Sequence, residues 1–226
     1  SSVYVRGLGA RIDTPVVGMN VDNVMLADKN LYDTELQDIE RIEFLRGPQA
    51  TLYGRNTSGG VMNITTLSPL VWQGSRVMAE YATLRSARAS VAYYAKPTDK
   101  LGISVAANYS HNGGHFLNTY TNELCDVGDA TSLRLRAQVL LSSRWSLDNT
   151  LTASYVNEGG YAYRHYIPSE KRYEPIAYND PSRYERLSIS EGFVAKYEGA
   201  DLGANYGALA GTVDGGTYSG INADVE

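Results

Sequence analysis

The sequence has very few cysteines and histidines, two residue types that enzymes often use for covalent or metal chemistry. It holds one cysteine and three histidines among 226 residues. His111 and His115 lie four positions apart, but in a strand this spacing separates two side chains by about 13 Å. Cys125 and Asp126 lie downstream of them, without the ligand spacing of a structural zinc site. The sequence therefore predicts no catalytic residues, no metal site and no cofactor, and it indicates a protein that is not an enzyme.

Long apolar runs and a basic charge balance are also missing. No run of about 18 apolar residues exists, so no transmembrane helix is predicted. The net charge of −5 argues against a nucleic-acid binder, and a single cysteine leaves the cellular compartment open. The chain opens on the alternating "SSVYVRGLG" rather than on a signal peptide, which leaves a cytosolic protein or an upstream beginning as alternatives. Because "GINADVE" also stops in mid-alternation, we expect a piece of a longer protein.

Glycine and tyrosine are abundant instead. The chain has 22 Gly, 18 Tyr and 43% hydrophobic residues, which is typical of glycine-punctuated strands whose aromatic tips face a boundary between apolar and wet surroundings. From about residue 72 polar and apolar residues alternate in segments of about 9–11 residues or more, enough to cross a bilayer when tilted. Soluble strands are usually shorter. The predicted strands are 73–83, 87–96, 101–111, 131–142, 146–157, 187–198 and 201–212, with an eighth starting at Gly220.

The predicted connections alternate in length, as they do in outer-membrane barrels with short periplasmic turns and long extracellular loops. The short connection near Thr83–Ser86 is an exception, because it falls on the side of the long loops. Arg134, Arg136 and Gln138 share one face of a strand, and this face suits a hydrated lumen, with the apolar face toward lipid. The tight connections are 96–100, 142–145 and 198–201, and the long ones are 112–130 and 158–186.

Residues 1–68 have a different texture. In "DTELQDIERIE", Leu36, Ile39 and Ile42 repeat at roughly helical spacing before a strand at Ile42–Leu45, with Asp33 or Thr34 as N-cap. The predicted fold is mainly β: a small α+β domain at 1–68 precedes antiparallel transmembrane β-barrel strands at 69–226. A small closed barrel needs about eight strands, so seven or eight strands leave both a closed and an incomplete barrel open.

The stretch "ERIEFLRGPQATLYGRNTSGGVMNITT" predicts a glycine-tightened hairpin. A strand ends at Gly47-Pro48, because proline cannot donate to the next ladder, and Gly59-Gly60 forms a second turn before a return strand. The same stretch resembles the plug domain of the TonB-dependent outer-membrane receptors. The motifs that carry the resemblance, in order, are Val5-Arg6-Gly7, Arg46-Gly47-Pro48, Leu52-Tyr53-Gly54, Gly59-Gly60 and Asn63-Ile64.

The resemblance covers about residues 3–68 and departs from the family in the middle strand. Members commonly have an aromatic or Asp-Gly where this chain has Val21-Asp22-Asn23-Val24. The resemblance implies the C-terminal part of a plug followed by the first strands of a barrel. It also implies that the plug segment gripped by the TonB energy-coupling protein, and most of a barrel of roughly 22 strands, lie outside this sequence.

The resemblance assigns candidate site residues. Arg6 and Arg46 are expected to hold the plug in the lumen by pairing with barrel glutamates on later strands; the alternative is that each satisfies local carbonyls. Plug apices and the 158–186 loop are expected to contact a ligand by stacking and cation–π interactions. Solvated loop residues, or an interfacial aromatic girdle, are the alternatives. The candidate ligand residues are Arg11, Asp13, Lys29, Asn30, Tyr32, Tyr161, Tyr163, Arg164 and Tyr166.

The implied function is active import of a scarce, bulky small-molecule solute, most often a ferric siderophore. The implied place is the outer membrane of a Gram-negative cell, among its lipids, with TonB as partner and iron only as part of the solute. One alternative is a small self-contained outer-membrane barrel that serves as an adhesin or structural protein. A soluble carbohydrate-active β-sandwich enzyme would need an apolar interior face instead of Arg134 and Arg136, and a paired-carboxylate site that the sequence does not show.

Overall fold

The computed structural model describes residues 17–26, 38–47, 59–160, 164–177, 183–199 and 205–220. Within these ranges the chain forms a four-stranded sheet, a seven-stranded sheet and two short two-stranded hairpins. No helix occurs in the described ranges, and so none there is long and apolar enough to span a membrane. The mainly β fold class is confirmed.

The small sheet has the strand order β2-β1-β4-β3. Strand β1 runs parallel to β4, and the pairs β1/β2 and β3/β4 are antiparallel. The glycines of the predicted hairpin take backbone angles that favour glycine: φ is 94° at Gly47 and 150° at Gly60. The four strands are β1 (Val17–Val21), β2 (Val24–Met25), β3 (Ile39–Arg46) and β4 (Gly60–Thr66).

The large sheet is an antiparallel meander in which each strand pairs with the next long strand of the chain. Its order is β15-β14-β11-β10-β7-β6-β5, and its strands are 9 to 17 residues long. These lengths reach or exceed the roughly 9–11 residues that a tilted strand needs to cross a bilayer. The strands are β5 (Gly74–Ala82), β6 (Ser86–Thr98), β7 (Leu101–Asn112), β10 (Gly128–Leu140), β11 (Trp145–Gly159), β14 (Arg183–Gly199) and β15 (Asn205–Gly220).

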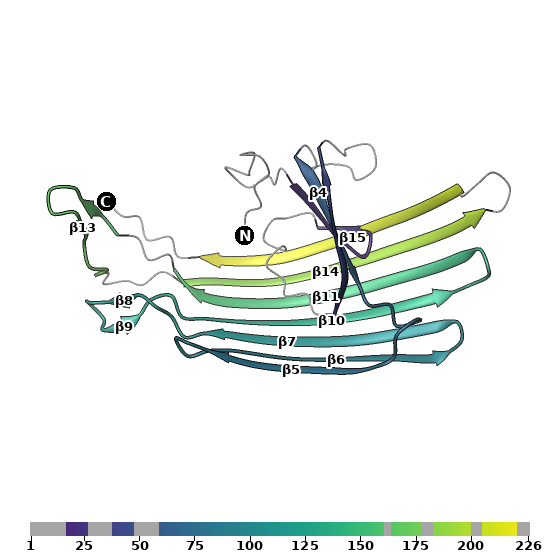
Figure 1. Ribbon diagram of the computed structural model, residues 1–226, viewed down its shortest axis with the longest axis horizontal. Coiled ribbons are helices and arrows are strands. Elements are labelled where there is room, and N and C mark those ends of the chain that lie inside the picture. The colour runs from purple at the N-terminus through teal and green to yellow at the C-terminus, as the bar shows by residue number, and fades with distance from the viewer. Residues whose placement is uncertain are drawn as a thin grey trace.

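The two faces of the large sheet differ as the alternation predicts. On β10, Leu133 and Leu135 are each 41% exposed, whereas Arg134 and Arg136 between and after them are each 7% exposed. The same order holds on β14, where Leu187 and Ile189 are exposed and Ser188 is buried. The polar face is covered by the small sheet, which lies over it in Figure 1. This arrangement reverses that of a soluble sandwich, whose covered faces are apolar.

The two long connections lie at one end of the large sheet, opposite the tight turns after β6 and β10 (Figure 1). The short β5–β6 turn, with positive φ at Leu84 and Arg85, lies at the same end as the long connections. These long connections carry the hairpins β8 (Leu117–Asn118) with β9 (Glu123–Leu124), and β12 (Tyr166–Ile167) with β13 (Arg172–Tyr173).

Two local predictions are wrong. Ile39 lies in strand β3 rather than in a helix, because pairing with β4 fixes this segment in a sheet. The strand predicted at Ile42–Leu45 is confirmed as part of β3. The other end of the predicted helix, including Leu36, Asp33 and Thr34, lies outside the described residues. The eighth strand does not start at Gly220, because β15 runs on to that residue in register with β14.

Candidate functional site between the two sheets

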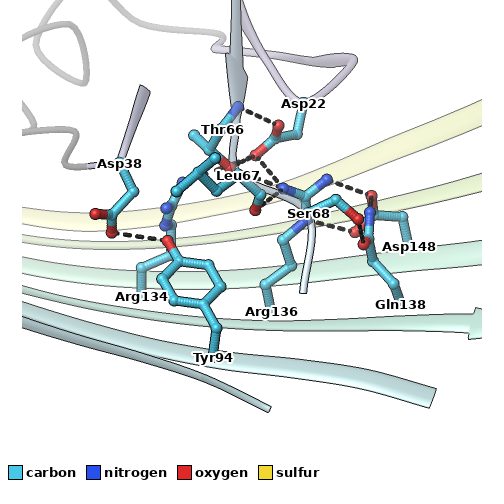
Figure 2. A network of polar contacts seen from close by, with 10 residues as sticks. All are labelled: Asp22, Asp38, Thr66, Leu67, Ser68, Tyr94, Arg134, Arg136, Gln138 and Asp148. Atoms are coloured by element: carbon cyan, nitrogen blue, oxygen red, sulfur yellow. Dashed lines mark hydrogen bonds and ion pairs between the residues drawn. The ribbon is translucent and has the colours of Figure 1, made fainter. Parts of the chain in front are cut away.

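A buried polar network joins the small sheet to the polar face of the large sheet (Figure 2). It begins at Asp22, in the two-residue turn between β1 and β2. Asp22 and Asn23 both have positive φ, 52° and 68°, as tight turns with a right-handed twist require. The Asp22 carboxylate accepts hydrogen bonds from the Thr66 amide at 2.9 Å and the Thr66 hydroxyl at 2.7 Å. The turn is thereby tied to the end of β4.

Arg136 of β10 is the central cation of this network. Its Nε and Nη2 donate to the two carboxylate oxygens of Asp148 on β11, at 3.0 and 2.6 Å. Its Nη1 donates to the Thr66 hydroxyl at 2.7 Å and lies 3.1 Å from Asp22 Oδ2. Only 5% of the Arg136 side chain is exposed. Bidentate, charge-assisted bonds of this kind fix both distance and orientation.

Asp38, just before β3, makes a second attachment. Its φ of 62° is again left-handed, and its Oδ2 accepts a 2.7 Å hydrogen bond from the Tyr94 hydroxyl of β6. Arg76 Nη1 of β5 lies 3.5 Å from Asp38 Oδ1. Trp72 supports both partners: its ring meets Tyr94 edge-on and lies under the Arg76 guanidinium, with 5.0 Å separations in each case. The carboxylates of Asp22 and Asp38 thus contact three strands of the large sheet.

The segment between the sheets adds a third attachment. The Ser68 hydroxyl donates to Gln138 Oε1 at 2.6 Å, and Gln138 Nε2 donates to Asp148 Oδ2 at 2.8 Å. The Asp148 carboxylate is therefore bound from two sides. We call the contacts of Asp22, Asp38, Thr66, Ser68, Tyr94, Arg136, Gln138 and Asp148 the anchor.

Arg134 is the exception in this region. Its side chain is 8% exposed and its Nη1 lies 3.7 Å from Asp22 Oδ2, too far for a hydrogen bond. Among the described residues this Nη1 has no hydrogen-bond partner. A buried guanidinium N–H without an acceptor is costly, so Arg134 keeps donor capacity that Asp22 does not use.

Next to Arg134 lies a cavity of about 50 Å³, which is room for a few water molecules. Aliphatic side chains of β1, β2 and the following residue form its small-sheet wall; they are Met19, Val21, Val24 and Leu26. Its large-sheet wall is formed by Arg134 and by Thr150, Thr152, Ser154, Ser188, Ser190 and Gly192. At Gly192 an added Cβ would lie 2.5 Å from Val24 Cγ2, so glycine permits the close approach. We call the contact between these two walls, with the cavity between them, the seam.

A second cluster lies in the two long connections. The Thr119 amide and hydroxyl both donate to the Ile176 carbonyl, at 2.7 and 2.9 Å, and this joins the two connections. The Arg164 guanidinium lies over the Phe116 ring at 5.2 Å and over the Tyr173 ring at 5.3 Å. Tyr166 packs against Tyr173 with ring centroids 5.0 Å apart. A cation held between aromatic rings is a surface for planar or anionic ligands.

The first of these connections has its own support. The Asp126 carboxylate accepts hydrogen bonds from the amides of His115 and Phe116. The Cys125 thiol donates to the Phe116 carbonyl at 3.3 Å, and burial raises the pKa of this thiol. His111 contacts Asp129 at 2.9 Å, and no group of three or more metal-ligating side chains occurs in the described part of the chain.

The structure describes three of the predicted site residues. Arg46 is exposed at the end of β3, opposite Gly60, and its pairing with a barrel glutamate stays a prediction. Arg164 and Tyr166 lie in the loop cluster described above. The remaining residues lie outside the described ranges: Arg6, Arg11, Asp13, Lys29, Asn30, Tyr32, Tyr161 and Tyr163.

Sequence reasoning missed most of the anchor. It placed Arg134, Arg136 and Gln138 on an inward polar face but gave them no partner. Asp22 and Asp38 were not singled out, although an Asp-Asn pair between two short apolar runs is a signal for a tight hairpin turn. Tyr94 is one of 18 tyrosines and has no local signal.

The comparisons with known proteins agree with this architecture. Residues 1–61 match the family model of the TonB-dependent receptor plug domain. The pesticin receptor of Yersinia pestis is 39% identical over 71 residues, which are 30% of this chain and 10% of that receptor. The vitamin B12 transporter BtuB of Photobacterium profundum is 32% identical over 114 residues, 50% of this chain and 17% of that transporter.

Among solved structures, the fold is similar to the ferric yersiniabactin uptake receptor FyuA from Yersinia pestis. The TM-score is 0.79 at 20% sequence identity, and the match covers 97% of this chain and 35% of FyuA. This chain therefore spans about a third of the length of that receptor, and smaller shares of the two relatives named above.

A small sheet fixed to the polar face of bilayer-length strands defines a class: outer-membrane barrels that carry a plug in the lumen. Within that class, residues 1–61 match the plug domain of the TonB-dependent receptors, and the described part of the chain has the fold of a part of such a receptor.

Proposed function

We propose that the chain is part of a receptor that imports a ferric siderophore across the outer membrane of a Gram-negative cell, energised through TonB. The observation that carries the proposal is the anchor. A small sheet held by buried ion pairs and hydrogen bonds against the polar face of membrane strands closes the lumen, and a closed lumen requires an energised step to open. No bond of the solute changes; differential binding and a displacement of the plug are sufficient.

The loop cluster supports ligand capture at the outer end. Arg164 between Phe116 and Tyr173 presents one cation and several ring faces, which suits an anionic or aromatic solute. We propose Arg11, Asp13, Lys29, Asn30 and Tyr32 of the plug apices, and Tyr161, Tyr163, Arg164 and Tyr166 of the loop, as ligand contacts. Arg6 and Arg46 are proposed to lock the plug through glutamates on later strands of the full receptor.

Two relatives point to different solutes. FyuA is named for ferric yersiniabactin, and BtuB for vitamin B12. A siderophore is favoured because the described loop cluster combines a cation with aromatic rings, and many ferric siderophores are anionic and bulky. The adhesin alternative shares the barrel but has no use for a plug that is held by buried charges.

Uptake in cells tests the proposal. The full-length receptor that contains this segment would be expressed in a strain without its own siderophore receptors, and uptake of ⁵⁵Fe-labelled yersiniabactin, ferric enterobactin and ⁵⁷Co-labelled vitamin B12 would be measured. We expect uptake of a ferric siderophore that disappears when TonB is deleted. Uptake of vitamin B12 alone would show that the solute is vitamin B12 rather than a ferric siderophore. The absence of TonB-dependent uptake for all three solutes would contradict the proposal.

A further inference from the structure

The small sheet meets the large sheet in two chemically different ways. At the anchor, polar groups of both sheets are matched with one another. At the seam, the aliphatic side chains of Met19, Val21 and Val24 face a wall of serine and threonine hydroxyls. Aliphatic groups cannot accept or donate hydrogen bonds to this wall, and the cavity of about 50 Å³ remains between the surfaces. The seam is therefore the side on which the two sheets separate at least cost.

Arg134 stands at the edge of the seam. It lines the cavity, and its buried Nη1 has no hydrogen-bond partner among the described residues. The carboxylate facing it is Asp22, at 3.7 Å. The Asp22 carboxylate accepts its hydrogen bonds from Thr66, which belongs to the same small sheet. A displacement of the hairpin would thus carry Asp22 and Thr66 away together.

The consequence for charge differs between the two arginines of β10. Arg136 loses its contacts with Asp22 and Thr66 but keeps its bidentate partner Asp148, which belongs to the large sheet. Arg134 loses the carboxylate that faces it. Displacement of the β1–β2 hairpin would therefore leave a cation with unused donors on a wall of hydroxyl groups. Guanidinium forks and hydroxyls are the groups that bind carboxylates and similar oxyanions.

We propose that Arg134, with the hydroxyl wall of Thr152, Ser154, Ser188 and Ser190, is a transit site for an anionic oxygen group of the solute. In the closed state the Asp22 carboxylate faces Arg134 and masks it. When the hairpin is displaced, an anionic group of the solute takes the place of Asp22, and the seam becomes the path of the solute. This inference rests on the proposed function, because it names the path that an imported solute takes.

Chemical rescue tests the replacement of Asp22 without any knowledge of the solute. In the purified full-length receptor, Asp22→Ala removes the carboxylate, and formate is added as the probe, with chloride at equal ionic strength as control. Amide exchange of β1 and β4 peptides reports how tightly the small sheet is held. We expect formate, and not chloride, to slow exchange in Asp22→Ala by roughly tenfold at saturating probe, and to have a smaller effect in the double variant Asp22→Ala/Arg134→Gln, in which Arg136 is the remaining cation next to position 22. Equal rescue in both variants, or none, overturns the inference.

A second measurement stands if Asp22→Ala does not fold. Ser190→Cys is introduced into the full-length receptor with Cys125→Ser, and cells are treated with an anionic or a cationic methanethiosulfonate. We expect energised cells to label Ser190→Cys roughly tenfold faster with the anionic reagent, because a cationic wall concentrates anions. Arg134→Gln should remove the preference, and an uncoupler should remove the labelling. No labelling, or labelling without a charge preference, contradicts the inference.

The two proposals fail separately. Rescue by formate without uptake of any tested solute would refute the proposed function and leave the anion site standing. Uptake of a ferric siderophore without rescue and without a labelling preference would refute the transit site and leave the import function standing.

Discussion

The anchor and the seam lie side by side under the same small sheet, yet they differ in almost every physical respect. At the anchor, buried charges are paired: Asp22, Arg136 and Asp148 have side chains that are 2%, 5% and 11% exposed. At the seam, small hydroxyl side chains and Gly192 face aliphatic groups across a cavity. The difference shows that the small sheet is bound to the large sheet through paired polar groups at the anchor and only packs against it at the seam.

The largest expected effect comes from the centre of the anchor. Arg136→Met would leave Asp148 and Asp22 buried without their main cation, and breaking a buried pair on one side typically costs about 3–5 kcal/mol. We expect the free energy of opening of the small sheet in the full-length receptor to fall by that amount, as measured by amide exchange of β1 and β4 peptides. Arg136→Lys keeps the charge but loses the two-pronged guanidinium, so its exchange rate should lie between those of the unmodified receptor and Arg136→Met. An unchanged exchange rate in Arg136→Met would remove the distinction between anchor and seam.

A substitution at the seam tests the close approach of the two sheets. Gly192→Ala places a Cβ 2.5 Å from Val24 Cγ2 and 3.1 Å from Val24 Cβ, so the hairpin must shift. Overpacking of this kind costs about 1–3 kcal/mol. The expected outcome is faster exchange of β1 and β2 amides, with the anchor residues near Asp148 unaffected.

The matched control for that substitution is Val24→Ala. In the double variant Gly192→Ala/Val24→Ala the clash is relieved, so we expect most of the lost protection to return and the two changes to be non-additive. Additive losses would show that Gly192 acts through something other than its contact with Val24.

Tyr94 tests the second attachment. Tyr94→Phe removes the hydroxyl that donates to Asp38 at 2.7 Å and leaves a buried carboxylate with Arg76 as its remaining partner among the described residues. Loss of a hydrogen bond to a charged group costs about 1.5–3 kcal/mol. Exchange of β3 amides should report it. Tyr93→Phe, on the exposed face of the same strand, should change nothing, and an equal effect of both variants would contradict the assignment.

The large sheet could be predicted from sequence because its alternation is local and long. The alternation of leucine and arginine at residues 133–136 indicates which face is polar. The seven predicted strands overlap the seven observed ones. The helical segment predicted before the strand Ile42–Leu45 is wrong at Ile39, because pairing of β3 with β4 overrides a weak helical period. Resemblance to the plug family located the small sheet in the sequence, but it did not predict the contacts between this sheet and the large one.

The anchor could not be predicted because its members are far apart in the chain. Asp22 and Arg136, or Asp38 and Tyr94, meet only when the small sheet docks on the large one, and no local pattern encodes that register. Resemblance favoured arginines on the plug and acids on the barrel. The described anchor has the opposite polarity, with Asp22 and Asp38 on the plug side and Arg136 on the strand wall, while the predicted lock of Arg6 and Arg46 stays a prediction.

The smallest effects are expected from the removal of one serine hydroxyl at the anchor and one at the seam. Ser68→Ala removes a hydroxyl that donates to Gln138 at 2.6 Å, and a neutral hydrogen bond of this kind contributes about 1 kcal/mol. Ser190→Ala removes a hydroxyl that faces the cavity, where water can satisfy it, so the change should stay within about 0.5 kcal/mol. Both are read from the same β1 and β4 amides. A larger loss in Ser190→Ala than in Ser68→Ala would mean that the seam holds the small sheet at least as firmly as the anchor does, and it would contradict the distinction between the two contacts.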